Sequence, residues 1–335
     1  MPAAHQYIER ESGAIRQERL FNDALVRFLY HPVREKAPLL FRKLTEARLS
    51  SWLGFLHFDQ ALGARVLGNR RFIRESGIDF RECLEPPHSF NTARKVFERR
   101  IRYWECRPLP DDPQAVVSPA DGRILIGSFR DTSSLHLKDK FFHFDELLGP
   151  DQKRWINAFH DGDFCILRLT PDKYHYNHTP VTGVVVDFYE LEGDYHSCNP
   201  AAVVRMATPY SKNRRVVTVI DTDVQGGSRV GLVAMIEIVA LMIGDIVQCY
   251  SRERYANPSP IYPSLFLERG CPKSLFRPGS STDVLIFQQE RIRFARDLLE
   301  NQRRTDVRSR FSTGFGRPLA ETELRVRSLI GHPHF

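Results

Sequence analysis

The most informative part of the sequence is Phe276-Arg277-Pro278-Gly279-Ser280-Ser281-Thr282-Asp283, which runs directly into Val284-Leu285-Ile286-Phe287. The apolar run predicts a strand buried inside a sheet. Pro278 fixes its own φ and stiffens the turn, and Gly279 lacks a Cβ, so a hydroxyl can approach its carbonyl closely. The Ser280 hydroxyl is therefore suited to attack the Gly279 carbonyl. The alternative interpretation is an ordinary polar turn before a strand.

Outside this stretch, the pattern of apolar residues differs from one region of the chain to the next. Short β-type runs separated by turns extend from Ala115 to Phe287. The preceding region has apolar positions at helical spacing, as in Ile8 to Tyr30. The sequence therefore predicts an α+β protein with three parts: an N-terminal helical region at 1–110, a β-rich barrel-like or sandwich-like body at 111–300, and a frayed, basic C-terminal tail at 301–335.

The formal net charge is +7, and all of it lies in the first of these regions. Residues 1–110 hold 20 Lys and Arg against 13 Asp and Glu, whereas residues 111–335 hold 28 of each. A basic region attached to a neutral body predicts an anionic surface as partner, either acidic lipid or nucleic acid.

The segment from Trp52 to Phe58 favours the lipid. It combines aromatic and leucine side chains with the nearby cations Arg42, Lys43 and Arg48. That combination predicts an interfacial helix on an anionic membrane surface. The alternative is an ordinary amphipathic helix packed on the body. No pattern typical of nucleic-acid-binding domains accompanies it, so we expect no nucleic-acid partner.

Neither a signal peptide nor a membrane span is predicted. The N-terminus lacks an apolar core, and the longest apolar run, Val230 to Ile243, is interrupted by Glu237 and is too short to cross a bilayer. The six cysteines form no C-x-x-C pair, which is typical of reduced cytosolic thiols. We therefore expect a peripheral protein on the cytoplasmic side of the cell membrane.

Two further stretches contain side chains suited to acid–base chemistry. Ser118-Pro119-Ala120-Asp121-Gly122 predicts a turn that holds the Asp121 carboxylate rigidly, where it can orient an imidazole. His175 and His178 lie three apart in Tyr174-His175-Tyr176-Asn177-His178-Thr179-Pro180, and histidine titrates near neutral pH. A pair at this spacing can ligate a metal, but no H-E-x-x-H glutamate or cysteine cluster accompanies it. We therefore predict no metal site.

Taken together and in this order, the three stretches resemble the three signatures of the phosphatidylserine decarboxylase family. The matching segments are Ser118 to Gly122, Leu169 to Gly183, and Gly279-Ser280-Ser281-Thr282. The likeness extends over residues 89 to 290 or so. Pro278 stands where the family usually has leucine, and Ser274 and Val239 stand where glycines are common.

The resemblance implies a proenzyme that cuts itself between Gly279 and Ser280. Asp121 would hold His178, and His178 would take the proton from Ser280 as its Oγ attacks the Gly279 carbonyl. β-Elimination and hydrolysis would leave a covalent pyruvoyl group, derived from Ser280, as the cofactor. That group would take up the amine of phosphatidylserine and accept electrons as CO₂ leaves. His175 would return a proton to the α-carbon, which gives phosphatidylethanolamine.

The resemblance also implies how the protein is assembled. It predicts a homodimer in which each subunit, once processed, is a heterodimer of the 1–279 and 280–335 chains. A phospholipid in an anionic membrane surface is the expected substrate. Two alternatives stay open at this point: the same machinery acting on a free amino acid or another seryl lipid, and an unprocessed relative that only binds membranes.

Overall fold

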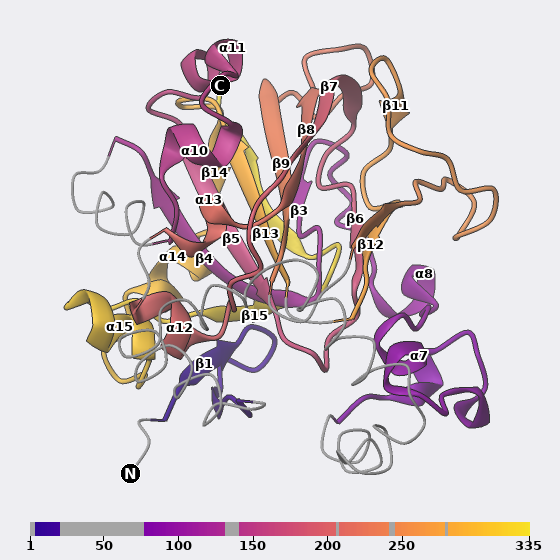
Figure 1. Ribbon diagram of the computed structural model, residues 1–335, viewed down its shortest axis with the longest axis vertical. Helices are drawn as coiled ribbons and strands as arrows, with labels where there is room; N and C mark the ends of the chain where they lie inside the picture. Colours follow the sequence, from indigo (N-terminus) through magenta and orange to yellow (C-terminus); the bar gives the residue numbers. More distant parts are fainter. Residues whose placement is uncertain (1–3, 21–76, 131–140, 206–207, 241–244, 279–280) are drawn as a thin grey trace.

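The computed structural model describes residues 4–20, 77–130, 141–205, 208–240, 245–278 and 281–335. A 10-stranded sheet in the order β11-β7-β8-β9-β13-β5-β4-β15-β1-β2 forms its centre (Figure 1). The strands of this large sheet are β1 (Gln6–Glu9), β2 (Ile15–Gln17), β4 (Gly122–Ser128), β5 (Asp163–Leu169), β7 (Gly183–Leu191), β8 (Arg215–Asp221), β9 (Leu232–Val239), β11 (Phe266–Leu267), β13 (Ser281–Phe287) and β15 (Thr322–Leu324).

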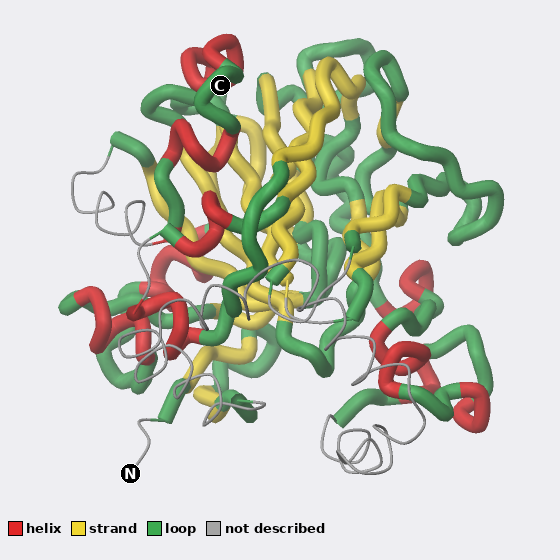
Figure 2. The backbone as a smooth tube through the Cα atoms, viewed as in Figure 1, coloured by secondary structure: helices red, strands yellow, loops and turns green. Residues whose placement is uncertain are grey.

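Two smaller sheets accompany the large one. The first has the order β10-β12-β6 and consists of β10 (Ile246–Gln248), β12 (Pro272–Phe276) and β6 (Tyr176–His178). The second has the order β14-β16-β3 and consists of β14 (Ile292–Phe294), β16 (Leu329–Pro333) and β3 (Val116–Val117). The strands occupy the middle of the molecule and the helices lie at its periphery (Figure 2).

The helices of the described residues are short. They are α7 (Ala93–Phe97), α8 (Tyr103–Cys106), α10 (Phe144–Leu148), α11 (Lys153–Ala158), α12 (Pro200–Arg205), α13 (Pro209–Lys212), α14 (Arg296–Gln302) and α15 (Arg310–Phe315), with 3-10 turns η2 (Phe80–Glu82) and η3 (Pro87–Ser89). Side chains from α10, α11, α12, α13 and α15 pack in one core against the large sheet. These helices therefore cover one face of that sheet.

Strand β13, predicted from its apolar run, lies near the middle of the large sheet. It pairs antiparallel with β5 on one side and with β9 on the other, and every one of its residues is buried. Successive side chains of a strand point to opposite faces. Val284 and Ile286 accordingly pack in the core under the helices, and Leu285 and Phe287 pack in the core on the other face. A run that is apolar on both faces is what a strand covered on both sides requires.

The helical prediction for residues 1–110 is not confirmed. Residues 6–17 are a β-hairpin, β1 and β2, whose β1 also pairs parallel with β15. The apolar spacing around Ile8 was misleading because Ile8 fills a small core with Val307 and Ala320, far along the chain. Residues 21–76, which include the predicted membrane helix, lie outside the described residues.

The prediction of a frayed tail at 301–335 is wrong. Strand β15 lies between β1 and β4 in the large sheet, and β16 lies between β14 and β3 in a smaller one. The Arg-rich composition of this region concealed short strands whose partners are distant in sequence. The prediction of a barrel also fails, because the described strands form open sheets, whereas the β-rich, mainly antiparallel body is confirmed.

A buried group of charged side chains, here called the hairpin cluster, fixes the N-terminal hairpin to the sheet. Arg168 donates to both Glu18 and Glu321, each at 2.6 Å, and Arg123 lies 2.8 Å from Glu18. His5 Nε2 lies 2.7 Å from Glu321. Burial acts to raise the pKa of Glu18, but Arg123 and Arg168 outweigh it and hold that pKa below its ordinary value. The hairpin cluster is therefore a paired network that joins β1, β2, β4, β5 and β15.

Candidate active site

The predicted cleavage point lies where the chain passes from a small sheet to the large one. Gly279 and Ser280 are outside the described residues, but the residues on both sides of them are described. Strand β12 ends at Phe276, and β13 begins at Ser281, which pairs with Leu169 on β5 and Val239 on β9. The predicted cleavage point thus lies between the central strand of a small sheet and a strand in the middle of the large sheet.

The predicted histidines lie beside β12, His178 on strand β6 and His175 directly before that strand. The Phe276 amide donates to the His175 carbonyl at 3.1 Å, so His175 lies next to the end of β12. His178 pairs with Pro272, where β12 begins. Residues three apart on an extended strand point to opposite faces. The sequence predicts a short loop here, whereas the structure places His178 at the end of β6 and His175 directly before it, with their rings in different surroundings.

His178 is a completely buried, neutral imidazole with a defined tautomer. Its Nδ1 lies 2.8 Å from the Gly270 carbonyl, which can only accept, so Nδ1 carries the proton. Nε2 therefore has a free lone pair, and it accepts a hydrogen bond from the Tyr174 hydroxyl at 2.9 Å. Burial lowers the pKa of His178 to about 3. A ring in this state is a base at neutral pH.

His175 is equally buried and also neutral. Its Nδ1 donates to the Lys173 carbonyl at 2.7 Å, and its ring stacks on Phe97 with centroids 3.5 Å apart. Burial, aided by the charge of Arg99, lowers the pKa of His175 to about 3. Among the described residues, no hydrogen-bond partner reaches its buried Nε2. That nitrogen is thus a bare acceptor inside the protein.

Asp121 lies close to β6 but does not bond His178. The His178 amide donates to the Pro119 carbonyl at 2.7 Å, which holds the 118–122 turn against β6. The Asp121 carboxylate instead accepts from Arg107, at 3.1 and 2.9 Å, and from the Val326 amide at 2.7 Å. Burial acts to raise its pKa, but Arg107 holds the pKa of Asp121 at about 2. The carboxylate therefore affects His178 through its charge, which raises the pKa of that imidazole.

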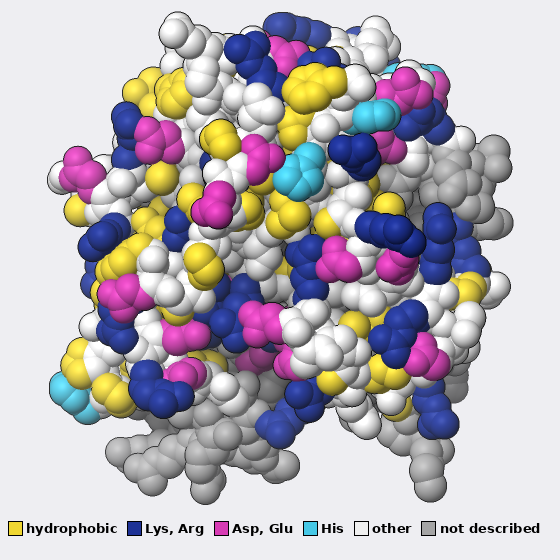
Figure 3. All heavy atoms as spheres, turned by 180° about the vertical axis from the view of Figure 1, so that it is seen from behind, with side chains coloured by type: hydrophobic (Ala, Val, Ile, Leu, Met, Phe, Trp, Pro, Cys, Tyr) yellow, Lys and Arg dark blue, Asp and Glu magenta, His cyan; other side chains and the backbone are white. Residues whose placement is uncertain are grey.

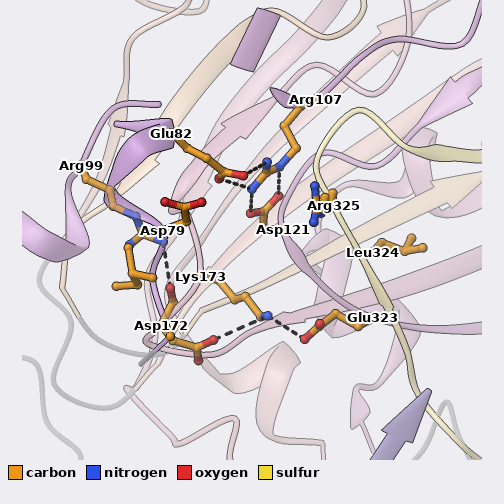
Figure 4. Close-up of a pocket in the computed structure, with 12 residues that line it drawn as sticks. Asp79, Glu82, Arg99, Arg107, Asp121, Asp172, Lys173, Glu323, Leu324 and Arg325 are labelled. Carbon is orange, nitrogen blue, oxygen red and sulfur yellow. Dashed lines mark hydrogen bonds and ion pairs between the residues drawn. The ribbon is translucent and has the colours of Figure 1, made fainter. Parts of the chain in front are cut away.

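Asp121 also faces a polar cavity of about 230 Å³. Figure 4 shows opposite charges alternating around it, with Arg107 bridging Glu82 and Asp121, and Lys173 bridging Asp172 and Glu323. Its lining residues are Gly77, Ile78, Asp79, Glu82, Arg99, Arg107, Asp121, Asp172, Lys173, Glu323, Leu324 and Arg325. Within the described part of the chain, the buried Arg99 guanidinium bonds the Val96 and Asp172 carbonyls, and no carboxylate there neutralises it by direct contact. The cavity suits a small molecule that carries both signs of charge.

Sequence reasoning missed Arg107, Tyr174 and Arg99 as parts of this site. Tyr174 belongs to the histidine stretch, so its position gave a signal. Arg107 and Arg99 lie in a segment that reads as an ordinary charged helix, and only tertiary structure shows that each faces Asp121 or the cavity.

A potential metal site outside this region is already charge-balanced. His5, Glu18 and Glu321 have ligand atoms within 4.8 Å of one another. The same two carboxylates, however, accept from Arg168, and Arg123 pairs with Glu18. A cation is not needed there to neutralise buried charge.

Comparison with known proteins identifies the family. The sequence pattern of phosphatidylserine decarboxylases matches residues 93–313, which is more than half of the chain. The chain belongs to the phosphatidylserine decarboxylase family. It is therefore a carboxy-lyase, and the described geometry can be interpreted in those terms.

Individual phosphatidylserine decarboxylases are similar over most of this chain. The phosphatidylserine decarboxylase proenzyme of Fusobacterium nucleatum is 28% identical over 313 residues, covering 93% of this chain and 97% of its own. That of Chlamydia trachomatis is 29% identical over 300 residues, covering 88% and 90%. That of Bordetella avium is 32% identical over 237 residues, covering 67% and 76%. All three are called proenzymes, which indicates a family whose members process themselves.

Proposed function

We propose that this phosphatidylserine decarboxylase cuts its own chain between Gly279 and Ser280 and acts on phosphatidylserine through the pyruvoyl group that results. Asp121, His178 and Ser280 would carry out the cleavage, and His175 would serve the decarboxylation. The observation that most supports this is the state of His178: a buried imidazole whose Nδ1 proton is committed to Gly270, which leaves Nε2 as a base.

In the proposed cleavage, His178 Nε2 takes the Ser280 hydroxyl proton while Oγ attacks the Gly279 carbonyl. The peptide C–N bond breaks, the Ser280 nitrogen takes up the proton, and an ester replaces the amide. Loss of the Ser280 α-proton then releases the Gly279 carboxylate, and water replaces the nitrogen as ammonia. For this to occur, Ser280 must displace the Tyr174 hydroxyl from His178 Nε2.

The negative charge of Asp121 supports His178 without touching it. As His178 takes a proton it becomes a cation, and a nearby carboxylate stabilises a cation. Arg107 keeps Asp121 ionised and in place with two hydrogen bonds. Asp121 would therefore act as an electrostatic partner of the base.

The residues next to the cleavage point fit a pyruvoyl group. A pyruvoyl carbonyl supplies an electrophile that takes up an amine and accepts electrons as CO₂ departs. His175 Nε2 and Ser281 Oγ are buried polar atoms that no described residue satisfies. Both lie beside this junction: His175 next to Phe276 at the end of β12, and Ser281 at the start of β13. They are available to orient the group and to move a proton there.

We also propose that a mixed-charge cavity of this kind receives the seryl headgroup, whose ammonium, carboxylate and phosphodiester require partners of both signs. Of the cavity's described cations, Arg99 is the one that no described carboxylate contacts. Arg99→Met is expected to raise KM for phosphatidylserine vesicles about tenfold with little change in kcat, because a charged hydrogen bond contributes about 1.5 kcal/mol or more to binding. A kcat loss without a KM change would contradict the assignment.

Membrane association is proposed on the basis of charge and substrate. Residues 1–110 hold the excess of Lys and Arg, and the substrate of the family is a membrane lipid. None of the helices in the described ranges is long and apolar enough to span a bilayer. On the face shown in Figure 3, basic and acidic side chains of the described residues are interspersed. We propose peripheral binding of a homodimer on the cytoplasmic side, through the basic N-terminal region.

Vesicle sedimentation of the full chain tests that proposal. Binding to phosphatidylserine-containing vesicles should exceed binding to phosphatidylcholine vesicles and should weaken as salt rises, because exposed charges are screened. Equal binding to both kinds of vesicle would contradict it. Sedimentation velocity of the same preparation reports whether the protein is a dimer.

The decisive experiment on function is the intact mass of the denatured protein beside its activity on phosphatidylserine vesicles and on free serine. The wild type should give two chains, 1–279 and 280–335, and should act on the vesicles. Ser280→Ala and His178→Ala should stay uncut, whereas His175→Ala should be cut and should turn over slowly. His160→Ala, an exposed histidine, is the matched control. A wild-type chain that stays uncut, or a His178→Ala chain that cuts normally, would overturn the assignment.

A further inference from the structure

The proposed mechanism leaves the source of one proton open, and the further inference rests on that mechanism. Replacing CO₂ at the α-carbon requires a proton. His175 was expected to give it, but its ring is neutral and its proton is on Nδ1, bonded to Lys173. The bare Nε2 can pass on a proton only after it has received one. A proton donor must therefore lie nearby.

The space between β13 and the β10-β12-β6 sheet contains a second buried group of charged side chains, here called the interlayer cluster. Its centre is Glu237 on β9, which accepts from Lys273 at 2.7 Å, from Gln248 at 3.1 Å and from Asn177 at 3.2 Å, and also from Ser274. Burial acts to raise the pKa of Glu237, but Lys273 outweighs it and lowers that pKa. Glu237 is therefore an ionised carboxylate with a full set of partners.

Asp283 lies directly opposite Glu237 on the neighbouring strand. Side chains of residues that face each other in an antiparallel pair project to the same side of the sheet, so the two carboxyl groups are neighbours. Asp283 is 0% exposed, and neither of its oxygens has a partner among the described residues. Glu237 and Asp283 cannot both be ionised in this buried space, because Lys273 is the cation beside them and it is already bound to Glu237. Burial and the charge of Glu237 raise the pKa of Asp283 well above its ordinary value.

Three buried polar groups without described partners occur near the junction: the Asp283 carboxyl, the Ser281 hydroxyl and His175 Nε2. None of them bonds another in this structure, so a proton passes between them only when the Ser281 hydroxyl rotates to contact its neighbours. Ser281 lies two residues before Asp283, so its hydroxyl is on the same face of β13, and its Oγ is buried and unbonded. His175 lies two residues before Asn177, whose amide reaches Glu237 across the same interlayer space. His175 precedes β6, but the bond from the Phe276 amide to its carbonyl extends the pairing by one residue, so His175 is directed to this side as well. Phe97 stacks on it there and packs with Leu169 and Val239, the partners of Ser281.

We propose that Asp283 stores the proton for decarboxylation and delivers it through the Ser281 hydroxyl to His175 Nε2. Asp283 gives its proton to Ser281 Oγ, the Ser281 proton passes to His175, and His175 gives a proton to the α-carbon that CO₂ has left. Asp283, then a carboxylate beside Glu237, takes a proton back from water. One proton is consumed for each CO₂ released. Asp283 acts through His175 and does not itself touch the substrate.

The structure also explains why such a donor is suitable. A carboxyl group that resists ionisation keeps its proton until it is needed. Transfer of that proton to His175 is uphill, and it is drawn forward because the carbon that has lost CO₂ removes the proton from His175. The groups that face Asp283 are Glu237 from β9 and, in the layer above, Lys273 from β12. Because Lys273 is bound to Glu237 and Gln248, it does not neutralise an ionised Asp283 by contact. The proton therefore returns after each turnover.

Infrared spectroscopy tests the stored proton without any need for activity. The uncut Ser280→Ala chain should show the carbonyl stretch of a protonated carboxylic acid at neutral pH, and Ser280→Ala/Asp283→Asn should lack it. The matched control is Asp163→Asn in the same background. Asp163 is also buried, on β5, and burial raises its pKa, but it lies opposite Phe287 at the far end of β13. Identical spectra with and without Asp283 would overturn the proposal.

Kinetics on the cleaved enzyme tests the delivery. Asp283→Asn should cleave normally and keep its KM, while kcat for phosphatidylserine falls about 100-fold, the usual effect of removing an acid catalyst. Asp163→Asn should turn over like the wild type. An Asp283→Asn enzyme with wild-type kcat would overturn the relay alone. A wild type that stays uncut would overturn the proposed function together with the relay, and the two failures are thus distinguishable.

Discussion

The hairpin cluster and the interlayer cluster are both buried against the large sheet, and each is built around carboxylates, yet they differ in completeness. In the hairpin cluster, Glu18 and Glu321 share Arg168, and Arg123 adds a second cation. In the interlayer cluster, Lys273 forms an ion pair with Glu237, and Asp283 has no hydrogen-bond partner among the described residues. The first cluster holds the N-terminal hairpin in place. The second contains a carboxyl group, Asp283, without a counter-charge in contact, three residues from the predicted cleavage point. We interpret a buried charged cluster that lacks a counter-ion as a sign of a catalytic role.

Removing the cation of the hairpin cluster should have the largest effect. Arg168→Met leaves two buried carboxylates with only Arg123 and His5 nearby, and breaking a buried pair in this way costs about 3 to 5 kcal/mol. Urea unfolding of the uncut Ser280→Ala chain measures the loss. Arg16→Met is the control, because Arg16 pairs with Glu9 at the surface and such pairs contribute less than about 1 kcal/mol. Equal losses in the two variants would remove the distinction between a complete network and a surface pair.

Removing the cation of the interlayer cluster should have a smaller effect. In Lys273→Met, Glu237 keeps its hydrogen bonds from Asn177, Ser274 and Gln248, so we expect a loss of about 2 to 3 kcal/mol. Adding Glu237→Gln to Lys273→Met should restore part of the lost stability, because a buried amide needs no counter-charge. Thermal unfolding of the single and double variants checks this. A Lys273→Met protein as stable as the parent would show that Glu237 is not ionised.

The two clusters should respond to pH with opposite signs. The pKa values of Glu18 and Glu321 are lowered in the folded state, so their contribution is present above their ordinary pKa and is lost as pH falls. The pKa of Asp283 is raised, so its contribution is present at low pH and is lost as pH rises above its ordinary value.

Asp283→Asn should accordingly gain stability over its parent between about pH 4 and pH 7, by at most about 1.4 kcal/mol per pH unit. Urea titrations of the uncut chain at several pH values measure the difference. A stability difference that does not depend on pH would mean that Asp283 has an ordinary pKa, and the contrast between the clusters would then be lost.

Local sequence was sufficient for some elements and insufficient for others. The run from Val284 to Phe287 predicts its strand because each residue is apolar and both faces are buried. The Asp121 turn follows from a short-range pattern in the same way, whereas the stretch with His178 was expected as a loop and contains strand β6. Ile8 and Leu324, in contrast, belong to strands that meet only in the folded sheet, so neither the hairpin nor the ordered C-terminal region could be read from neighbouring residues.

In the candidate site too, some features could be predicted from local sequence and others depend on contacts between distant residues. His175 and His178 were expected from sequence, but their tautomers depend on the carbonyls of Lys173 and Gly270, and Gly270 is 92 residues from His178. The expected bond from Asp121 to His178 is replaced by Arg107, which no local pattern connects to Asp121. Asp283 reads as the polar end of a turn, and only the register with Glu237 shows that it is buried beside another carboxylate.

The strand order has a consequence for the fate of the two proposed products of cleavage. Strand β13 is inserted between β9 and β5, and β15 between β4 and β1, so the 280–335 fragment occupies two separate slots in a sheet otherwise built by the 1–279 fragment. Pulling the fragments apart would break four strand interfaces of the large sheet, and also the pairing of β16 with β3 in a smaller sheet. Cleavage of the peptide bond would therefore not separate the fragments. They would stay associated, would not exchange with fragments of other molecules, and would separate only when the whole protein unfolds.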